Sequence, residues 1–450
     1  MSVMHKMLMA ASGGSAGEDS FWISLNGNAE VNTARGVASD SNNNVLVSGY
    51  GGDSGGTDFA TSYIYNTEGT LRYGRGFRSG NFPDRFFACA FNSAGDFLSV
   101  GEAGELSVAS GEDAFLVKYL SDGFMKKQKK LEYPTYTAFY GVDVASDDYP
   151  VVVGKTNVSN ADVCLIAKYD NGTNGPFLVW QRTLTDTASG TSGLLRFYAV
   201  SIDSNDNLYA AGQDAYGGSG LLVKYNSSGV LQWQKKLGSG TGSTSTKFNG
   251  CATDSSGNIY VSGSVGAFAN NYELVVKYNS SGVVQWQKKL GDSNKINQCS
   301  GVAVDSSGNV YTSGLAQGTQ IVATLCKYNS AGVLQFQRQL DFNTDVTQAN
   351  DDQGFAVSID SNNNVLWCGK AQSTPGATFF NMFVAKLPRD GTLTGTYGPA
   401  IYSASSLTSS TPTLTTTTPT FTDAASSLTD VTPSTPYVGR LGPFNLITIQ

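Results

Sequence analysis

Aspartate is the residue that could most often supply acid–base chemistry in this sequence, because it recurs at a fixed distance before a repeated glycine. The seven residues at this position are Asp40, Asn92, Ala145, Asp203, Asp254, Asp305 and Asp360. Paired carboxylates can act as acid and base on a glycosidic bond. A catalytic acid is needed once, however, and Asp followed by Ser and then Asn or Gly is typical of Asx-type turns. The repeated Asp is therefore predicted to form turns, and no catalytic residue is assigned.

Histidine and cysteine usage disfavours metal and thiol chemistry. His5 is the only histidine, and the six cysteines include no C-x-x-C pair, which excludes a structural zinc site. The DSNNN and DSSGN turns lack the dense carboxylates and the distal Glu of calcium loops. No metal or cofactor is expected. Small buried thiols inside strands, suited to assembly in a reducing cytosol, are predicted at Cys89, Cys164, Cys251, Cys299, Cys326 and Cys368.

The composition is that of a folded, acidic chain. Of its 450 residues, 40% are hydrophobic and 14% are charged, so the chain can bury a large core. The net charge of -7 leaves no basic surface for a phosphate backbone, which disfavours nucleic acid binding. No apolar run approaches the roughly 20 residues that cross a bilayer. The MLMAA stretch at residues 7–11 is shorter than the secretory core of about 7 to 15 residues, so neither membrane insertion nor a cleaved signal is expected.

Internal repeats determine the predicted fold. GCATDSSGNIYVSG at residues 250–263 and GVAVDSSGNVYTSG at residues 301–314 are near copies. LVVKYNSSGVVQWQKKL and TLCKYNSAGVLQFQRQL, at residues 274–290 and 324–340, are also near copies. A marker glycine ends the first half of each repeat, and its seven occurrences are Gly49, Gly101, Gly154, Gly212, Gly263, Gly314 and Gly369. Seven units of this length indicate a radial repeat architecture.

Each unit is predicted to form four short strands, exemplified by GVAVD, NVYVSG, LVVKYN and VVQWQKKL. One four-stranded unit cannot bury both of its faces, whereas seven packed radially can. The fold class is therefore all-β, a seven-bladed β-propeller over residues 21–398. FWISL at residues 21–25 looks like an outermost strand and is preferred over residues 392–397 for completing the last blade. Residues 1–20 are predicted to form an N-terminal anchor or arm.

The motifs from residue 36 to residue 393 resemble NHL-type and SBBP-type propeller repeats, with the GVAVD strand nearest the axis. This resemblance implies the fold and is nearly silent on function. Inter-blade packing is predicted for the repeated Lys-Tyr pairs and for four aromatic residues at one position of the outer strand. These four are Trp180, Trp233, Trp286 and Phe336.

Residues 399–450 form a Ser/Thr/Pro-rich segment with a seven-residue period. Its apolar positions in one phase are Leu407, Leu414, Phe421 and Leu428. One apolar residue per heptad is too few for a coiled coil, and repeated Pro breaks a helix. An extended stalk or a repetitive β-type wrap is predicted, serving as a spacer or a docking strap. The final GPFNLITIQ is expected to add as a strand to another chain's sheet.

The MSVMHKMLMAASGGSAG start and the SSLTDVTPS pattern resemble structural proteins of tailed bacteriophages, particularly tail-fibre and appendage proteins of marine phages. The resemblance implies a non-enzymatic virion protein, assembled in the host cytoplasm in multiple copies per particle. Its propeller head would be attached through its terminal segments, contacting other virion proteins and host cell-surface glycan. Two alternatives are a glycan-active enzyme (glycosidase or lyase) and a secreted bacterial surface propeller.

Loop variation among the repeats locates candidate ligand-binding residues. The distance from the marker glycine to the Tyr position of the third strand runs from 13 to 18 residues, whereas both hairpin turns keep their length. A rigid scaffold with one variable loop face is a binding arrangement. Aromatic residues in these loops suit stacking on sugars or protein contacts. They are Tyr50, Tyr133, Tyr216, Phe268, Tyr272, Phe379 and Phe380.

Overall fold

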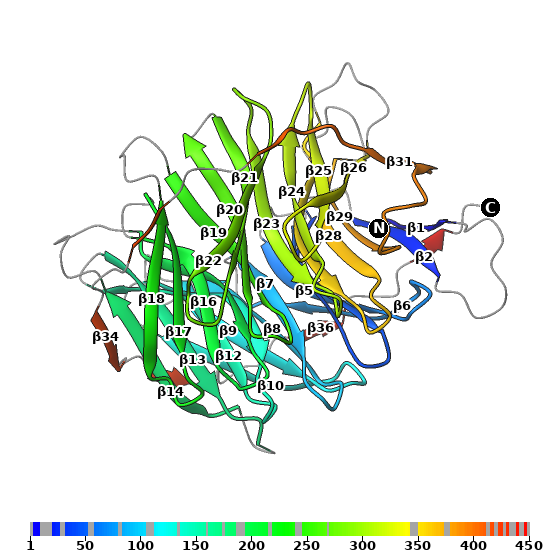
Figure 1. Cartoon of the computed structure of the whole chain (residues 1–450). Coiled ribbons are helices and arrows are strands. Elements are labelled where there is room, and N and C mark those ends of the chain that lie inside the picture. The colour runs from blue at the N-terminus through cyan, green and yellow to red at the C-terminus, as the bar shows by residue number, and fades with distance from the viewer. Residues whose placement is uncertain are drawn as a thin grey trace.

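Seven antiparallel sheets surround a central axis in the computed structural model of the chain, which confirms the predicted all-β, seven-bladed propeller (Figure 1). The structure describes residues 3–9, 20–27, 32–52, 58–79, 83–104, 112–132, 136–158, 161–172, 176–185, 194–214, 218–238, 245–267, 270–342, 350–372, 379–410, 415–417, 422–425, 429–431, 438–440 and 445–447. No helix in these ranges is long and apolar enough to cross a membrane.

Each blade contains four consecutive strands that run from the axis to the rim, except that blade 7 takes its fourth strand from the N-terminus. Blades 1 to 3 are β3 (Asn32–Ser39), β4 (Val45–Gly52), β5 (Asp58–Tyr65) and β6 (Leu71–Phe77); β7 (Asp84–Phe91), β8 (Phe97–Gly104), β9 (Glu112–Tyr119) and β10 (Met125–Glu132); and β11 (Thr137–Val144), β12 (Pro150–Val158), β13 (Ala161–Tyr169) and β14 (Leu178–Thr185). Blades 4 and 5 are β15 (Arg196–Ile202), β16 (Leu208–Gln213), β17 (Gly220–Tyr225) and β18 (Leu231–Gly238); and β19 (Ser245–Thr253), β20 (Ile259–Ala267), β21 (Asn270–Tyr278) and β22 (Val284–Leu290). Blades 6 and 7 are β23 (Asn297–Val304), β24 (Val310–Gln317), β25 (Ile321–Tyr328) and β26 (Leu334–Asp341); and β27 (Gln353–Ile359), β28 (Val365–Ala371), β29 (Asn381–Leu387) and β2 (Phe21–Gly27).

The N-terminal strand closes the ring, as its similarity to the outer strands predicts. β2 pairs with β29, whereas β30 (Gly395–Tyr397), in the competing segment, pairs with β31 (Ala400–Ala404) in blade 6. Trp22 of β2 is fully buried, and its indole Nε1 donates to the Thr67 carbonyl of blade 1 at 3.1 Å. Trp22 thus packs against the next blade in the manner of the other outer-strand aromatics. β1 (Val3–Met9), in the segment predicted as an arm, forms a hairpin with β2 and extends the same sheet.

The C-terminal segment runs around the rim and adds one outer strand to every blade; we call its seven strands the belt. They are β31 (Ala400–Ala404), β32 (Ser409–Ser410), β33 (Thr415–Thr417), β34 (Thr422–Ala425), β35 (Thr429–Val431), β36 (Val438–Arg440) and β37 (Asn445–Ile447). The belt visits blades 6, 5, 4, 3, 2, 1 and 7 in that order. Seven extended residues span roughly 23 Å, so the heptad period corresponds to the step from one blade to the next.

The belt resolves the two expectations for the tail in favour of the β-type wrap. The expectation that the terminal peptide adds to another chain's sheet is wrong for the three residues of β37. They pair in parallel with Val3, Met4 and His5 of β1 in the same chain. β1 presents an open edge there, and the wrap brings β37 to that edge, so the peptide finds an intramolecular partner.

The repeated Asp forms turns, as predicted, at the end of the blades that we call the turn end. In blade 5, Asp254 Oδ1 accepts hydrogen bonds from the backbone NH groups of Ser256 and Asn258, each at 2.9 Å. Its Oδ2 accepts from Asn258 Nδ2 at 2.8 Å and from the hydroxyl of Tyr260 at 2.9 Å. Each carboxylate oxygen is thus occupied by the local turn.

Aromatic residues and thiols occupy the predicted interior positions. A Cβ on Gly229 would lie 2.8 Å from the ring of Trp180 in the preceding blade, so the outer-strand aromatics pack between blades. Lys277 lies over the Tyr260 ring, 5.1 Å from Nζ to centroid, and donates to the Ser330 carbonyl of the next blade. All six cysteines are free and lie in strands, and all but the half-buried Cys251 are buried.

Candidate binding site at the axial mouth

One residue of each innermost strand forms a β-bulge near the end opposite the turns, which we call the mouth. The strand register shifts at an equivalent place in all seven blades, so that one residue lacks a partner on the second strand. Bulges redirect a side chain away from the regular alternation of a strand. The seven bulged residues are Arg35, Phe87, Tyr140, Tyr198, Asn249, Ser300 and Phe355.

The marker glycines make these bulges possible. Gly212 lies opposite Phe197, immediately before the bulge of blade 4, and a Cβ there would lie 1.8 Å from the Arg196 carbonyl oxygen. A Cβ added to each of the other marker glycines would lie 1.8 to 2.1 Å from the equivalent carbonyl oxygen. No residue with a side chain fits at this position, because its Cβ would overlap a backbone carbonyl that cannot move aside. A residue that is the same in all seven repeats therefore positions one that varies among them.

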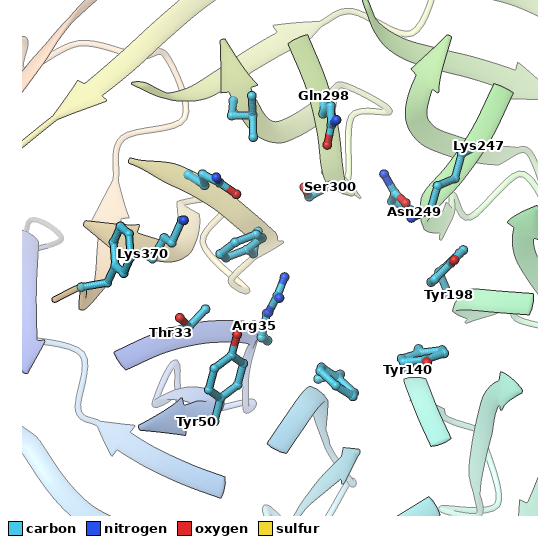
Figure 2. A pocket seen from close by; sticks show the side chains of 15 residues that line it. Thr33, Arg35, Tyr50, Tyr140, Tyr198, Lys247, Asn249, Gln298, Ser300 and Lys370 are labelled. Atoms are coloured by element: carbon cyan, nitrogen blue, oxygen red, sulfur yellow. The ribbon is translucent and has the colours of Figure 1, made fainter. Parts of the chain in front are cut away.

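The bulged residues surround a cavity of about 540 Å³ on the axis. Figure 2 shows their side chains converging on the opening from strands on all sides. The remaining described lining residues belong to the ends of the first two strands and to the loop before β29; they are Thr33, Tyr50, Lys247, Gln298, Leu315, Gln353, Lys370 and Phe380. Behind the bulged residues the channel continues as a space of about 220 Å³ with a small-residue and valine-rich wall. The volume suits a ligand of a few rings.

Aromatic side chains form a continuous wall on one side of the cavity. The rings of Phe87 and Tyr140 lie 5.3 Å apart, and those of Tyr140 and Tyr198 lie 5.5 Å apart. Burial raises the pKa of both tyrosines, so they are neutral hydroxyl donors and acceptors at physiological pH. A wall of this kind offers both a stacking surface and polar edges to a sugar ring.

Most cations near the mouth have carboxylate partners. Arg85 Nε contacts Asp58 Oδ2 at 2.7 Å, and Arg196 Nε contacts Asp162 Oδ2 at 2.6 Å. Lys370, which lines the cavity, contacts Asp351 at 2.5 Å. These pairs fix the rim and neutralise its charge.

Arg35 and Lys247 differ from these cations. Within the described part of the chain, neither forms an ion pair, and the buried Nε of Arg35 has no hydrogen-bond partner. The Arg35 guanidinium lies over the Phe355 ring at 4.1 Å, and the Lys247 ammonium lies over the Tyr198 ring at 4.0 Å. Burial, reinforced by the positive charges of Arg196 and Arg35, lowers the pKa of Lys247 to about 8.

The structure places two of the seven sequence-predicted site residues at this cavity, Tyr50 and Phe380. Tyr272 lies instead against Lys289, whose Nζ is 4.3 Å from its ring centroid, and Phe379 is exposed outside the cavity lining. The other three predicted residues, Tyr133, Tyr216 and Phe268, lie outside the described residues.

Sequence reasoning missed the seven bulged residues, although the sequence carries a signal for them. Each stands fourteen residues before a marker glycine, and the seven repeats place five residue types there: Arg, Phe, Tyr, Asn and Ser. The residue that follows is always Gly or Ala, and the next one is always Val or Cys. Variation in loop length does not point to this position, because it lies inside the innermost strands.

Comparisons with known proteins show a propeller repeat. The SBBP beta-propeller repeat family matches residues 285–320, and no curated protein matches the chain. Among solved structures, the chain is similar to Sqt1 from Chaetomium thermophilum, with 8% identity, coverage of 81% of this chain and 99% of that one, and a TM-score of 0.45. It is also similar to the polysaccharide lyase Uly1, with 10% identity, coverage of 87% and 99%, and a TM-score of 0.48. A third is the gluconolactonase XC5397 from Xanthomonas campestris, with 12% identity, coverage of 65% and 90%, and a TM-score of 0.35. These similarities concern the fold and assign no activity.

The described residues contain no group of three or more His, Cys, Asp or Glu side chains that could hold a metal ion. The chemistry that the mouth offers therefore comes from aromatic rings, hydroxyls, amides and the two cations without carboxylate partners.

Proposed function

We propose that this chain is a non-enzymatic binding protein whose axial pocket holds a saccharide. One observation carries the proposal: the position fourteen residues before the marker glycine varies among five residue types, and every blade contributes its side chain at this position to one cavity. Structural positions of a repeat tend towards one residue type, whereas a ligand that lacks sevenfold symmetry needs a different group in each blade.

The chemistry of the lining favours a saccharide. Tyr140 and Tyr198 supply adjacent rings, while Asn249, Ser300 and Gln298, from the two blades that follow Tyr198 around the opening, supply amide and hydroxyl groups (Figure 2). Aromatic faces beside a few directed polar groups are what a sugar ring requires, since it has apolar faces and a polar circumference.

Isothermal titration calorimetry against a panel of tetrasaccharides tests the binding function. Replacing Tyr198 with Ala removes part of the aromatic wall, so we expect about tenfold weaker binding of the tightest panel member. The matched control is Phe124→Ala, because Phe124 is 68% exposed at the turn end. The absence of binding by every panel member, or equal losses in the two variants, would contradict the proposal.

We further propose that the propeller is the head of a virion structural protein of a tailed phage, in which the mouth faces host-surface glycan. The sequence resemblance of the N-terminal and C-terminal segments supports this placement. Mass spectrometry of purified phage particles is the test, with the intact chain expected at a copy number that matches a symmetric component. Absence of the chain from particles would remove the virion placement and leave the binding function standing.

A truncation that lacks residues 399–450 tests whether the belt contributes to attachment. Its backbone pairs with the chain's own blades, so a truncated protein that stays folded and is still incorporated into particles would assign the belt a purely intramolecular role. Loss of incorporation with retained ligand binding would support attachment through the belt.

A glycan-cleaving enzyme is the second candidate function, and Lys247 is the observation that favours it. With a pKa of about 8, part of its population is neutral near physiological pH and able to accept a proton. Appearance of new reducing ends from a bound tetrasaccharide, abolished in Lys247→Met, would establish this candidate. An intact tetrasaccharide after prolonged incubation would support simple binding.

A further inference from the structure

We propose that the axial pocket selects saccharides that carry an anionic group, a carboxylate or a sulfate, and that Arg35 and Lys247 together hold its charge. The inference deepens the binding function proposed above and rests on it. It names a chemical class of ligand and two residues that determine specificity.

Some cations around the mouth have carboxylate partners and others do not. Arg85, Arg196 and Lys370 each have an aspartate partner within 2.7 Å. Arg35 and Lys247 have none among the described residues, although both line the cavity, and no described lining residue is Asp or Glu. A half-buried cation without a counter-charge is costly unless a ligand supplies one.

Among the described residues on the strands around Lys247, none is a carboxylate that neutralises it. Arg196 on β15 and Arg35 on β3 are the charged groups that act on it, and both are positive. The Tyr198 ring lies beneath its ammonium group. On the adjoining strands, Ser264 of β20 is its register partner and the uncharged Gln298 of β23 lines the same cavity. An anion bound here would relieve a concentration of like charge that no described residue compensates.

The placement of the two cations relative to the aromatic wall gives a further argument. Arg35 comes from blade 1 and Lys247 from blade 5, and Figure 2 shows Tyr140 and Tyr198 on the stretch of rim between them. A sugar ring stacked on these tyrosines would have its ring substituents within the reach of both cations. Arg35 contributes a planar guanidinium suited to an oxyanion, and Lys247 contributes a point charge.

The overall charge of the chain restricts the ligand to one whose anionic group enters the pocket. A net charge of -7 repels a polyanion at long range, so the attraction is confined to the mouth. Short acidic oligosaccharides, or the end of a longer chain, fit this field better than an extended polyanion lying across the surface.

Matched pairs of ligands test the class directly. Tetragalacturonate and its fully methyl-esterified form share one sugar skeleton and differ in charge, and a sulfated galactan tetrasaccharide with its desulfated form does the same for sulfate. Calorimetry at pH 6.5 with the full-length chain is expected to show binding at least tenfold tighter for the charged member of one pair. The pair that shows the difference identifies carboxylate or sulfate as the ligand group.

Four variants assign the charge to the proposed residues. Lys247→Met and Arg35→Gln are each expected to weaken binding of the charged ligand about tenfold and to weaken binding of the uncharged ligand much less. Lys277→Met is the matched control, because Lys277 also lies over a tyrosine ring of blade 5 but at the turn end. Lys247→Arg keeps the charge and so keeps most of the affinity.

Binding to the wild-type chain should weaken as the pH rises through the range in which Lys247 loses its proton, and binding to Lys247→Arg should not. This readout separates charge from shape, because a purely steric role of Lys247 has no such pH dependence.

The outcomes separate this inference from the binding function on which it rests. Equal affinity for the charged and uncharged members of both pairs would overturn the anionic class and leave a saccharide-binding pocket in place. No binding by any of the four ligands, with circular dichroism showing a folded chain, would count against both. Selectivity for the charged ligand that survives in both Lys247→Met and Arg35→Gln would overturn the assignment to these residues.

Discussion

The two ends of the innermost strands are built on opposite principles. At the turn end, five of the seven blades carry the same Asp in the turn, and adjacent turns are linked by hydrogen bonds such as those from Ser361 of blade 7 to Asn43 of blade 1. At the mouth, the bulged residue changes from blade to blade, and Arg35 and Lys247 have no carboxylate partners among the described residues.

The difference shows how one repeat supports both a scaffold and a site. Regular residues fill positions where all blades meet the same surroundings, and their polar groups are satisfied locally. At the mouth, seven side chains share one cavity, so uniformity would produce a symmetric pore rather than a pocket for a particular ligand. The marker glycine connects the two principles, because it is repeated and it creates the variable position.

The largest loss of stability is expected when a marker glycine is replaced. Gly212→Ala places a Cβ 1.8 Å from the Arg196 carbonyl oxygen, so the bulge that aims Tyr198 must shift. We expect a loss of about 3 kcal/mol or more in the free energy of unfolding. Gly218→Ala in the same blade is the control, because nothing lies within 4 Å of its added Cβ. Urea denaturation distinguishes the two, and equal stabilities would show that the glycine does not shape the bulge.

The sequence predicts the scaffold well because each of its signals is local and recurs in most of the seven units. Asp turns, alternating Val and Tyr, and the outer-strand Trp each identify a blade element, and the similarity of FWISL to an outer strand identifies the closing segment. The belt is harder to predict, because a heptad of Ser, Thr and Pro specifies an extended chain but not the edges to which it pairs.

The site is predicted less well for a physical reason. A bulge depends on the backbone of two strands at once, and residues such as Arg35 and Lys247 become neighbours only when the ring closes. That neither cation has a carboxylate partner in the described part of the chain is a property of the assembled mouth, which the sequence does not show. Tyr50 and Phe380 were found because aromatic residues in variable loops are a general signature of binding.

The second largest loss of stability is expected when the aspartate of a turn is replaced. Asp254→Ala removes four hydrogen-bond acceptances within one turn, and we expect it to lower the free energy of unfolding by about 2 kcal/mol at pH 7. Burial alone would raise the pKa of Asp254, but hydrogen bonds from Asn258 and its neighbours outweigh burial and lower it.

The contribution of the Asp254 carboxylate is therefore present above about pH 4 and is lost as the pH falls through the lowered pKa. The gap between wild type and variant should narrow in acid, as measured by denaturation at pH 7 and pH 3. Ligand affinity should stay unchanged, and a loss of affinity would break the separation between the two ends.

A change in stability of similar size tests whether a residue type found in only one repeat, such as Glu273, is by itself a sign of function. Glu273 of β21 is buried between blades 5 and 6, and burial raises its pKa to about 8 despite a hydrogen bond from Thr324 Oγ1 at 2.6 Å. The folded state binds this proton more tightly than the unfolded state, so stability falls as the pH rises from about 4.5 to about 8. Glu273→Gln is expected to be more stable than wild type by on the order of 2 kcal/mol at pH 8.5 and equal at pH 4.5. Unchanged ligand affinity would classify this singular residue as structural, whereas lost affinity would extend the site inward.

The smallest effect on stability is expected at Lys247, and its sign is the informative part. Burial and the neighbouring cations lower the pKa of Lys247 from 10.5 to about 8, so the unfolded chain binds this proton more tightly and the charged form destabilises the fold. Lys247→Met should therefore raise the free energy of unfolding by on the order of 1 kcal/mol at pH 7, and the gain should disappear between pH 8 and pH 10.5 as the wild-type lysine loses its charge in both states.

The same variant is expected to lose affinity for a charged saccharide, whereas Lys277→Met at the turn end should lose a little stability and no affinity. Stabilisation combined with lost binding is the signature of a residue retained for a ligand. A Lys247→Met variant less stable than wild type at pH 7 would instead make this lysine part of the scaffold and remove the contrast between the two ends of the blade.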